Sequence, residues 1–184
     1  MQIETTPLDG VLILTPRRFA DSRGHFSETW NQRVLAEAGV ALEFVQDNHS
    51  WSRDAGTVRG LHYQSPPSAQ DKLVRVARGR IWDVAVDVRQ GSSSYGQWTG
   101  VELSDENGRQ LLVPKGFLHG FATLEPGCDV VYKCSAFYDP ATEGAVRFDD
   151  PALGIDWHLP GPAHLSDKDA AAPSFAEFQS PFNT

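Results

Sequence analysis

The sequence predicts an all-β protein, a sandwich or jelly roll of antiparallel strands with a few short helices. Apolar residues recur mostly with period two in short runs, and the breaks between runs are rich in the Gly, Pro, Asn, Asp and Ser residues that form turns. The runs do not alternate with long helical segments, as they would in a parallel sheet. The predicted strands cover residues 11–14, 44–48, 58–64, 73–78, 81–88, 98–103, 110–113 and 130–138. Turns are predicted at residues 90–94, 105–108 and 125–127.

The run over residues 81–88 shows the alternation most clearly. Trp82 and Val84 share one face of the predicted strand, and Asp83 and Asp87 share the other. We therefore expect one face of this strand to be packed and the other to be wetter.

Helical pattern is confined to two places. Residues 31–38 are typical of a short helix, with Asn31 as its N-cap and Gly39 as its stop. The tail after Asp149 is Pro-rich and irregular, and we expect it to wrap around the sheets or to include a short helix near Asp167.

Length and composition limit the classes of function. A chain of 184 residues is expected to form a single domain over residues 1–184. Its 24 acidic and 16 basic side chains give a net charge of −8, which argues against nucleic acid as a partner because that binding needs a dense basic face. No run approaches about 18 consecutive apolar residues, and no basic segment followed by an apolar run opens the chain. We expect a cytoplasmic protein without a membrane partner.

The two cysteines are expected to be structural. Cys128 and Cys134 lie six positions apart in a segment that alternates like a strand, which would separate them by roughly 20 Å. A disulfide needs Cα atoms within about 7 Å, and two cysteines do not make a four-cysteine zinc site. Two small, buried thiols are the favoured interpretation.

Two histidine segments could carry chemistry. In the strand over 59–64, Gly60 lies two positions before His62 and leaves room beside the imidazole for a ligand. A hydrogen-bonded core histidine beside a bulge glycine is about equally compatible with these residues. Residues 114–121 form a Pro-x-Gly-x-x-His turn that places His119 at the start of another strand, which taken alone is a weak signal.

Other candidates are weaker when taken singly. Tyr132 and Tyr138 fall on one face of the predicted strand 130–138, where tyrosines that cap a core are the favoured interpretation. Lys72, Lys168 and Asp169 are each more typical of surface charges than of catalytic groups.

A metal site is not expected. Metal-binding cupins share the Pro-x-Gly-x-x-His turn, but their first motif is His-x-His followed by a carboxylate, and here Gln64 stands in place of the second histidine. Gln64 is a poor transition-metal ligand, and Ser68 and Ala69 occupy the carboxylate positions. His62 and His119 alone do not complete a site, so we predict neither a metal nor another cofactor.

Read together, the segments resemble the dTDP-4-dehydrorhamnose 3,5-epimerase family, the cupin-like jelly-roll enzymes of dTDP-L-rhamnose biosynthesis. Several separate motifs occur in the family's order, which is a specific signal. The matching segments are Pro16, residues 21–28, 46–50 and 59–64, Lys72, and residues 114–121, 132–134, 137–138 and 165–169. One departure is Phe137, where many relatives carry a tyrosine next to Tyr138. In the predicted strand Phe137 lies on the opposite face from Tyr132, so we expect no loss of chemistry.

The resemblance implies inversion at C3 and C5 of dTDP-4-dehydro-6-deoxy-D-glucose. The 4-keto group acidifies both C–H bonds, so a base can remove each proton to give an enolate and an acid can return it on the opposite face. His62 would be the base and Asp169 would hold its other nitrogen. Tyr132 would return the proton, and Lys72, assisted by His119, would stabilise the enolate oxygen without a metal.

The same resemblance implies a set of substrate contacts and a homodimer with shared active sites. The dTDP moiety would be bound by Arg23, Arg59, Lys168, Glu28, Gln46, Asn48, Glu143 and Tyr138, the last stacking on thymine. Strand parity places Arg59 and His62 on opposite faces. A local bulge would resolve this conflict, as would a partner chain that lends Arg59 or Arg23; because the family exchanges N-terminal segments in a dimer, we prefer the second solution.

Two alternatives stay open at the level of sequence. Relatives on this fold invert only C3 or only C5 of other deoxysugars, with similar His, Asp and Lys residues. A cupin that binds a metal or small ligand without epimerising is the alternative from another class of function.

Overall fold

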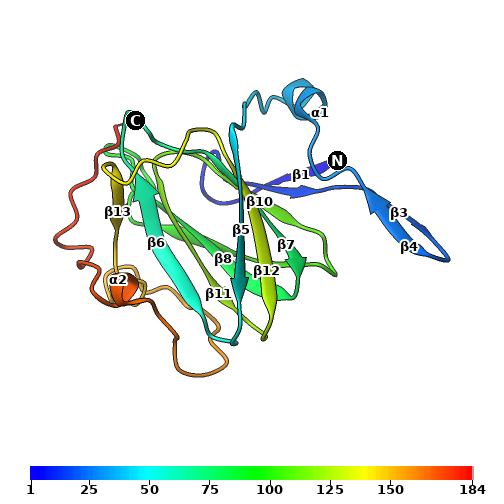
Figure 1. Ribbon diagram of the computed structural model, residues 1–184. Helices are drawn as coiled ribbons and strands as arrows, with labels where there is room; N and C mark the ends of the chain where they lie inside the picture. The colour runs from blue at the N-terminus through cyan, green and yellow to red at the C-terminus, as the bar shows by residue number, and fades with distance from the viewer. Residues whose placement is uncertain (184) are drawn as a thin grey trace.

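The computed structural model describes residues 1–183, which form two facing antiparallel sheets and a projecting hairpin (Figure 1). The six-stranded sheet has the order β1 (Gln2–Thr5), β2 (Leu12–Thr15), β10 (Gln110–Val113), β7 (Lys72–Arg78), β12 (Cys128–Cys134) and β5 (Gln46–Ser52). The five-stranded sheet has the order β13 (Glu143–Ala145), β6 (Val58–Gln64), β11 (Phe117–Thr123), β8 (Arg80–Asp87) and β9 (Trp98–Ser104). The hairpin consists of β3 (Arg18–Asp21) and β4 (Gly24–Ser27). The predicted all-β fold is confirmed.

The main core lies between the two sheets. Val74 and Val130 contribute from the six-stranded sheet, and Ala85, Phe117 and Phe121 contribute from the five-stranded sheet. These side chains lie at every second position of their strands, because alternate residues of a strand share one face. Period-two apolar runs in the sequence thus become the facing inner surfaces of the two sheets.

The C-terminal tail covers the outer face of the five-stranded sheet, as expected. Val84 and Leu118 pack beneath Trp157 and Phe182 of the tail in a second buried cluster. Figure 1 shows this tail running beside β6 and β13. The even-numbered face of β8 is therefore buried against the tail rather than against the opposite sheet.

The predicted wetter face of β8 is wrong. Asp83 and Asp87 are fully buried, because the odd-numbered face of β8 points between the two sheets. Each carboxylate is paired: Asp83 with His119 and Asp87 with Arg89. Polar residues at alternate positions of this strand therefore mark an interior polar layer and not a solvent-facing surface.

The two predicted helices are present. In α1 (Gln32–Glu37) the Asn31 side chain accepts hydrogen bonds from the backbone N–H groups of Arg33 and Val34, which makes Asn31 the N-cap. The second, α2 (Asp167–Ala170), begins after Ser166. Within residues 1–183, no helix is long and apolar enough to cross a membrane.

The predicted strand over residues 130–138 is too long. Strand β12 ends at Cys134, and the chain turns away before Tyr138, whose side chain is half exposed. Parity therefore does not govern where Tyr138 lies. The cysteine prediction is confirmed: Cys128 and Cys134 occupy the two ends of β12 as free, buried thiols.

Candidate active site

A cavity of about 530 Å³ opens between the two sheets and is closed on one side by α2. It is lined by eight of the candidate residues, together with seven residues that were not candidates. The candidates are Arg59, His62, Lys72, His119, Tyr132, Glu143, Lys168 and Asp169; the others are Ser50, Thr57, Val58, Phe121, His164, Leu165 and Ser166. Residues that were weak candidates for a functional role when taken singly therefore lie together in one cavity.

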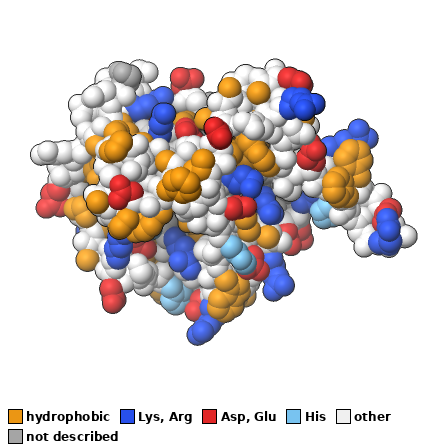
Figure 2. Space-filling view, turned by 45° about the horizontal axis from the view of Figure 1, so that its top comes forward, with side chains coloured by type: hydrophobic (Ala, Val, Ile, Leu, Met, Phe, Trp, Pro, Cys, Tyr) orange, Lys and Arg blue, Asp and Glu red, His pale blue; other side chains and the backbone are white. Residues whose placement is uncertain are grey.

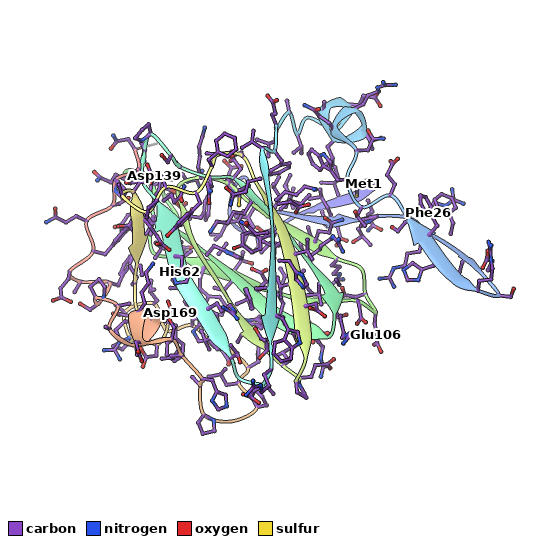
Figure 3. All side chains as sticks on the ribbon, viewed as in Figure 1. Met1, Phe26, His62, Glu106, Asp139 and Asp169 are labelled. Carbon is purple, nitrogen blue, oxygen red and sulfur yellow. The ribbon has the colours of Figure 1, made fainter. Side chains whose placement is uncertain are left out.

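His62 and Asp169 form a close pair at the cavity wall (Figure 3). His62 lies on β6, and its Nε2 is 2.5 Å from Oδ1 of Asp169 on α2. Ser166 caps α2 by accepting a hydrogen bond from the Asp169 backbone N–H, which fixes the start of the helix. Burial opposes ionisation, but the bonds from His62 and Ser166 hold the pKa of Asp169 below its ordinary value. The ionised carboxylate orients the ring and leaves Nδ1 as the nitrogen that can accept a proton.

A bulge places Arg59 and His62 in the same cavity. On β11, His119 and Phe121 lie opposite His62 and Arg59 of β6, so that β6 carries one residue more than its partner over this stretch. The bulge resolves the parity conflict for Arg59 within one chain, so no partner chain is needed to supply Arg59. That a partner chain lends Arg23 stays a prediction. The Arg59 guanidinium is anchored to Ser52 Oγ at 3.3 Å.

Tyr132 and Lys72 reach the cavity from the opposite sheet. They lie on the neighbouring strands β12 and β7, whose register pairs Tyr132 with Val74 and Cys134 with Lys72. Burial raises the pKa of the Tyr132 hydroxyl, so that it stays protonated well above neutral pH. Burial lowers the pKa of the Lys72 ammonium, while Asp83 and Glu143 partly oppose the shift. The site thus holds a neutral proton donor and a desolvated amine opposite His62.

Glu143 joins the cavity to a smaller hollow. Its Oε2 is 2.6 Å from Nζ of Lys168 and accepts a hydrogen bond of 2.9 Å from the Tyr138 hydroxyl. Burial opposes ionisation, yet the bonds from Lys168 and Tyr138 lower the pKa of Glu143. The hollow, of about 100 Å³, is also lined by Gln46, Asn48 and Tyr138.

Arg23 and Glu28 are not brought to the cavity within one chain. Arg23 lies at the turn of the β3–β4 hairpin, 88% exposed and paired with Asp21 at 2.6 Å. Glu28 follows the hairpin and accepts a hydrogen bond from Asn31. Figure 3 shows Phe26 of this hairpin on the opposite side of the molecule from His62.

Sequence reasoning missed Asp83 and Ser50. Asp83 lies 2.7 Å from Nε2 of His119, and its position in an otherwise apolar alternating strand was the available signal. Ser50 Oγ is buried in the cavity wall without a hydrogen-bond partner in residues 1–183, and it shares a strand face with Asn48. A polar residue two positions from a site residue on one strand was the signal there.

The donor set does not fit a bound metal ion. Over residues 1–183, no three His, Cys, Asp or Glu side chains are grouped to hold one. His62 and His119 each direct Nε2 toward a carboxylate rather than toward a common point. The absence of a metal or other cofactor stays a prediction.

The comparisons with known proteins agree on one family. Residues 5–177 match the family model described as dTDP-4-dehydrorhamnose 3,5-epimerase. Two proteins of that name are similar to this chain: that of Methanothermobacter thermautotrophicus, with 51% identity covering 84% of this chain and 82% of the relative, and that of Salmonella typhimurium, with 48% identity covering 94% of both. The crystal structure of the Legionella pneumophila dTDP-6-deoxy-D-glucose-3,5-epimerase in complex with dTDP-4-keto-L-rhamnose matches with a TM-score of 0.93 and 45% identity, covering 97% of this chain and 94% of that one.

Proposed function

The chain belongs to the dTDP-4-dehydrorhamnose 3,5-epimerase family and is an epimerase, and we propose that His62, Asp169, Tyr132 and Lys72 carry out its reaction. The substrate is dTDP-4-dehydro-6-deoxy-D-glucose, and inversion at C3 and C5 gives dTDP-4-dehydro-L-rhamnose for dTDP-L-rhamnose biosynthesis. The observation that carries the assignment of residues is the His62–Asp169 pair, which faces Tyr132 and Lys72 across a single cavity. Family membership removes the alternative of a cupin without epimerase activity.

Deprotonation requires a base and a place for the negative charge. Nε2 of His62 is taken by Asp169, so Nδ1 accepts the proton from C3 or C5 and the carboxylate stabilises the resulting imidazolium. The electrons of the broken C–H bond move into the enolate, whose oxygen is stabilised by the Lys72 ammonium and by His119. No redox step is involved.

Reprotonation on the other face completes each inversion. Tyr132 comes from the six-stranded sheet and His62 from the five-stranded sheet, so a sugar ring between them has one group on each face. The raised pKa of Tyr132 keeps its hydroxyl available as a proton donor at neutral pH.

The nucleotide half of the substrate accounts for the cationic and amide groups. Arg59 and Lys168 would bind the diphosphate, and Gln46, Asn48 and Glu143 would accept or donate further hydrogen bonds. The half-exposed Tyr138 ring would stack on thymine. Figure 2 shows Lys and Arg side chains interspersed with Asp and Glu on the visible face, so the net charge of −8 does not prevent a local site for a dianion.

A homodimer with an exchanged N-terminal segment would bring Arg23 and Glu28 to a cavity. The projecting hairpin carries Phe19 and Phe26, which are 51% and 69% exposed, although large exposed aromatics are unusual on an isolated hairpin. Phe137 and Tyr138, beside the smaller hollow, are also exposed. Docking the hairpin of one chain on the cavity rim of another would cover both aromatic groups. We propose the cytoplasm as the site of this reaction, with which two free thiols are compatible.

Mixing two inactive variants tests the shared site. Arg23→Ala leaves the cavity intact and His62→Ala leaves the hairpin intact, so a mixed dimer has one complete site if the hairpin is exchanged. Random reassociation would restore about a quarter of the wild-type sites. Absence of any recovery, with mixed dimers verified by mass, would exclude exchange.

Incubation in deuterated water tests the reaction and its regiochemistry together. We expect deuterium at both C3 and C5 of the product, observed by NMR, because each proton is removed once and replaced from a solvent-exchanging group. Incorporation at a single carbon would select the alternative of a C3-only or C5-only epimerase. No incorporation at either carbon would reject deprotonation altogether.

Replacing Tyr132 by phenylalanine is expected to separate exchange from inversion. His62 still removes the proton and can return a solvent deuteron on the same face, so deuterium enters the sugar while formation of the inverted product falls by about 10²-fold. NMR and chromatography of the same reaction measure both quantities. Equal loss of exchange and inversion would show that Tyr132 is needed for deprotonation and is not the acid alone.

A further inference from the structure

We propose that Asp83 is a positioning residue for the epimerisation, holding Nε2 of His119 so that Nδ1 of the ring is presented to the substrate's keto oxygen. The inference rests on the proposed function, because it concerns the oxygen that becomes the enolate. It adds a residue that neither lines the cavity nor belongs to the matched motifs.

The geometry of this second pair repeats that of the first. His119 on β11 lies directly opposite His62 on β6, so the two imidazoles are cross-strand neighbours on one wall of the cavity. Nε2 of His119 is 2.7 Å from Oδ1 of Asp83, just as Nε2 of His62 is held by Asp169. In each pair a carboxylate takes the same ring nitrogen and leaves Nδ1 for the substrate.

The burial of the second pair indicates a role beyond stability. The side chain of Asp83 is 0% exposed and that of His119 is 10% exposed. A buried carboxylate is costly unless all its lone pairs are satisfied, yet Oδ2 of Asp83 has no hydrogen-bond partner among the described residues. An apolar pair would fill this position at lower cost, so the charge itself is the feature that needs explaining.

The charge of Asp83 fits the needs of an enolate site. His119 can assist the oxyanion only by donating from Nδ1, and with Nε2–H already donated to Asp83 that form of the ring is the imidazolium. The neighbouring carboxylate stabilises this cation in a place with little water. The same negative charge acts on Lys72, since it opposes the lowering of the Lys72 pKa by burial. Asp83 would thus hold the donating form of His119 directly and would favour that of Lys72 through its charge.

The decisive experiment is a double-mutant cycle between Asp83 and His119. Asp83→Asn keeps the size of the side chain and removes its charge, and we expect kcat to fall by about 30-fold while the Kd for dTDP stays within about two-fold of wild type. In a His119→Gln background the same change should alter kcat by less than about two-fold, because the group through which Asp83 acts is gone. Equal losses in both backgrounds, or an unchanged kcat in the single variant, would overturn the proposal.

Asp87→Asn is the matched control. Asp87 lies on the same strand and the same face as Asp83 and is equally buried, but it binds Arg89 and does not line the cavity. We expect this variant to lose stability and to keep its kcat. A fall in kcat as large as that of Asp83→Asn would assign the effect of both to a disturbed β8.

Histidine NMR of the wild-type protein keeps the proposal testable if Asp83→Asn does not fold. With ¹⁵N-labelled histidine, the His119 signals should report a hydrogen on Nε2, both free and with dTDP bound. An unprotonated Nε2 would contradict the pairing with an ionised Asp83. Failure of deuterium exchange in the wild type would reject the proposed function, whereas normal exchange with an unaffected Asp83→Asn variant would reject this inference alone.

Discussion

Replacing His62 by alanine is expected to lower kcat by about 10³-fold and to abolish deuterium exchange at both C3 and C5. Proton abstraction by a positioned base is worth about 10²–10⁴ in rate. The neighbouring imidazole of His119 is assigned to the enolate oxygen, so it does not replace His62 as the base. The Kd for dTDP should stay within about two-fold, because the Arg59 and Lys168 contacts remain. Product NMR and calorimetry measure the two quantities separately.

His49→Ala is the matched control for this experiment. His49 on β5 also pairs with a carboxylate, at 2.7 Å from Asp129, but its side chain is 59% exposed and lies outside the cavity. Its removal should leave kcat within about two-fold. Deuterium exchange that persists in His62→Ala would remove His62 as the base.

Replacing Asp87 by asparagine is expected to lower the free energy of unfolding by about 3 kcal/mol at neutral pH. The buried carboxylate accepts hydrogen bonds from Arg89 Nη2, Ser92 Oγ and Ser94 Oγ, each at 2.7 Å. The substitution leaves the Arg89 charge without its partner. Urea unfolding of both proteins at pH 7 measures the difference.

The pH dependence of that difference follows from the direction of the pKa shift. Burial opposes ionisation, but Arg89, Ser92 and Ser94 together hold the pKa of Asp87 far below its ordinary range. A group with a depressed folded pKa stabilises fully above its unfolded pKa, which for Asp is about 3.9, and loses that contribution as the pH falls toward the folded value. The two proteins should therefore differ by a constant amount from pH 7 to about pH 5 and converge progressively below about pH 4. A difference that does not shrink in acid would show that Asp87 acts through packing and not through its charge.

The sequence predicted the strands well where one face packs against a continuous apolar surface. The predicted strands over residues 58–64 and 110–113 coincide with β6 and β10, since alternation and turn residues act locally. It failed for β13 and for the hairpin of β3 and β4, which are short and carry little apolar alternation. Parity also failed for Arg59, because a bulge depends on the register with a neighbouring strand that the local residues do not specify.

By itself the sequence determined the fold class, the candidate histidines and the family that their motifs resemble, because these depend on residue types at short spacings. Tertiary structure alone decided which charged groups meet. His62 and Asp169 are 107 positions apart and His119 and Asp83 are 36 apart, yet each pair is in hydrogen-bond contact. The pairing of β6, β11 and β8 and the docking of α2 bring them together, and their removal from water makes the charge of each carboxylate effective on its imidazole.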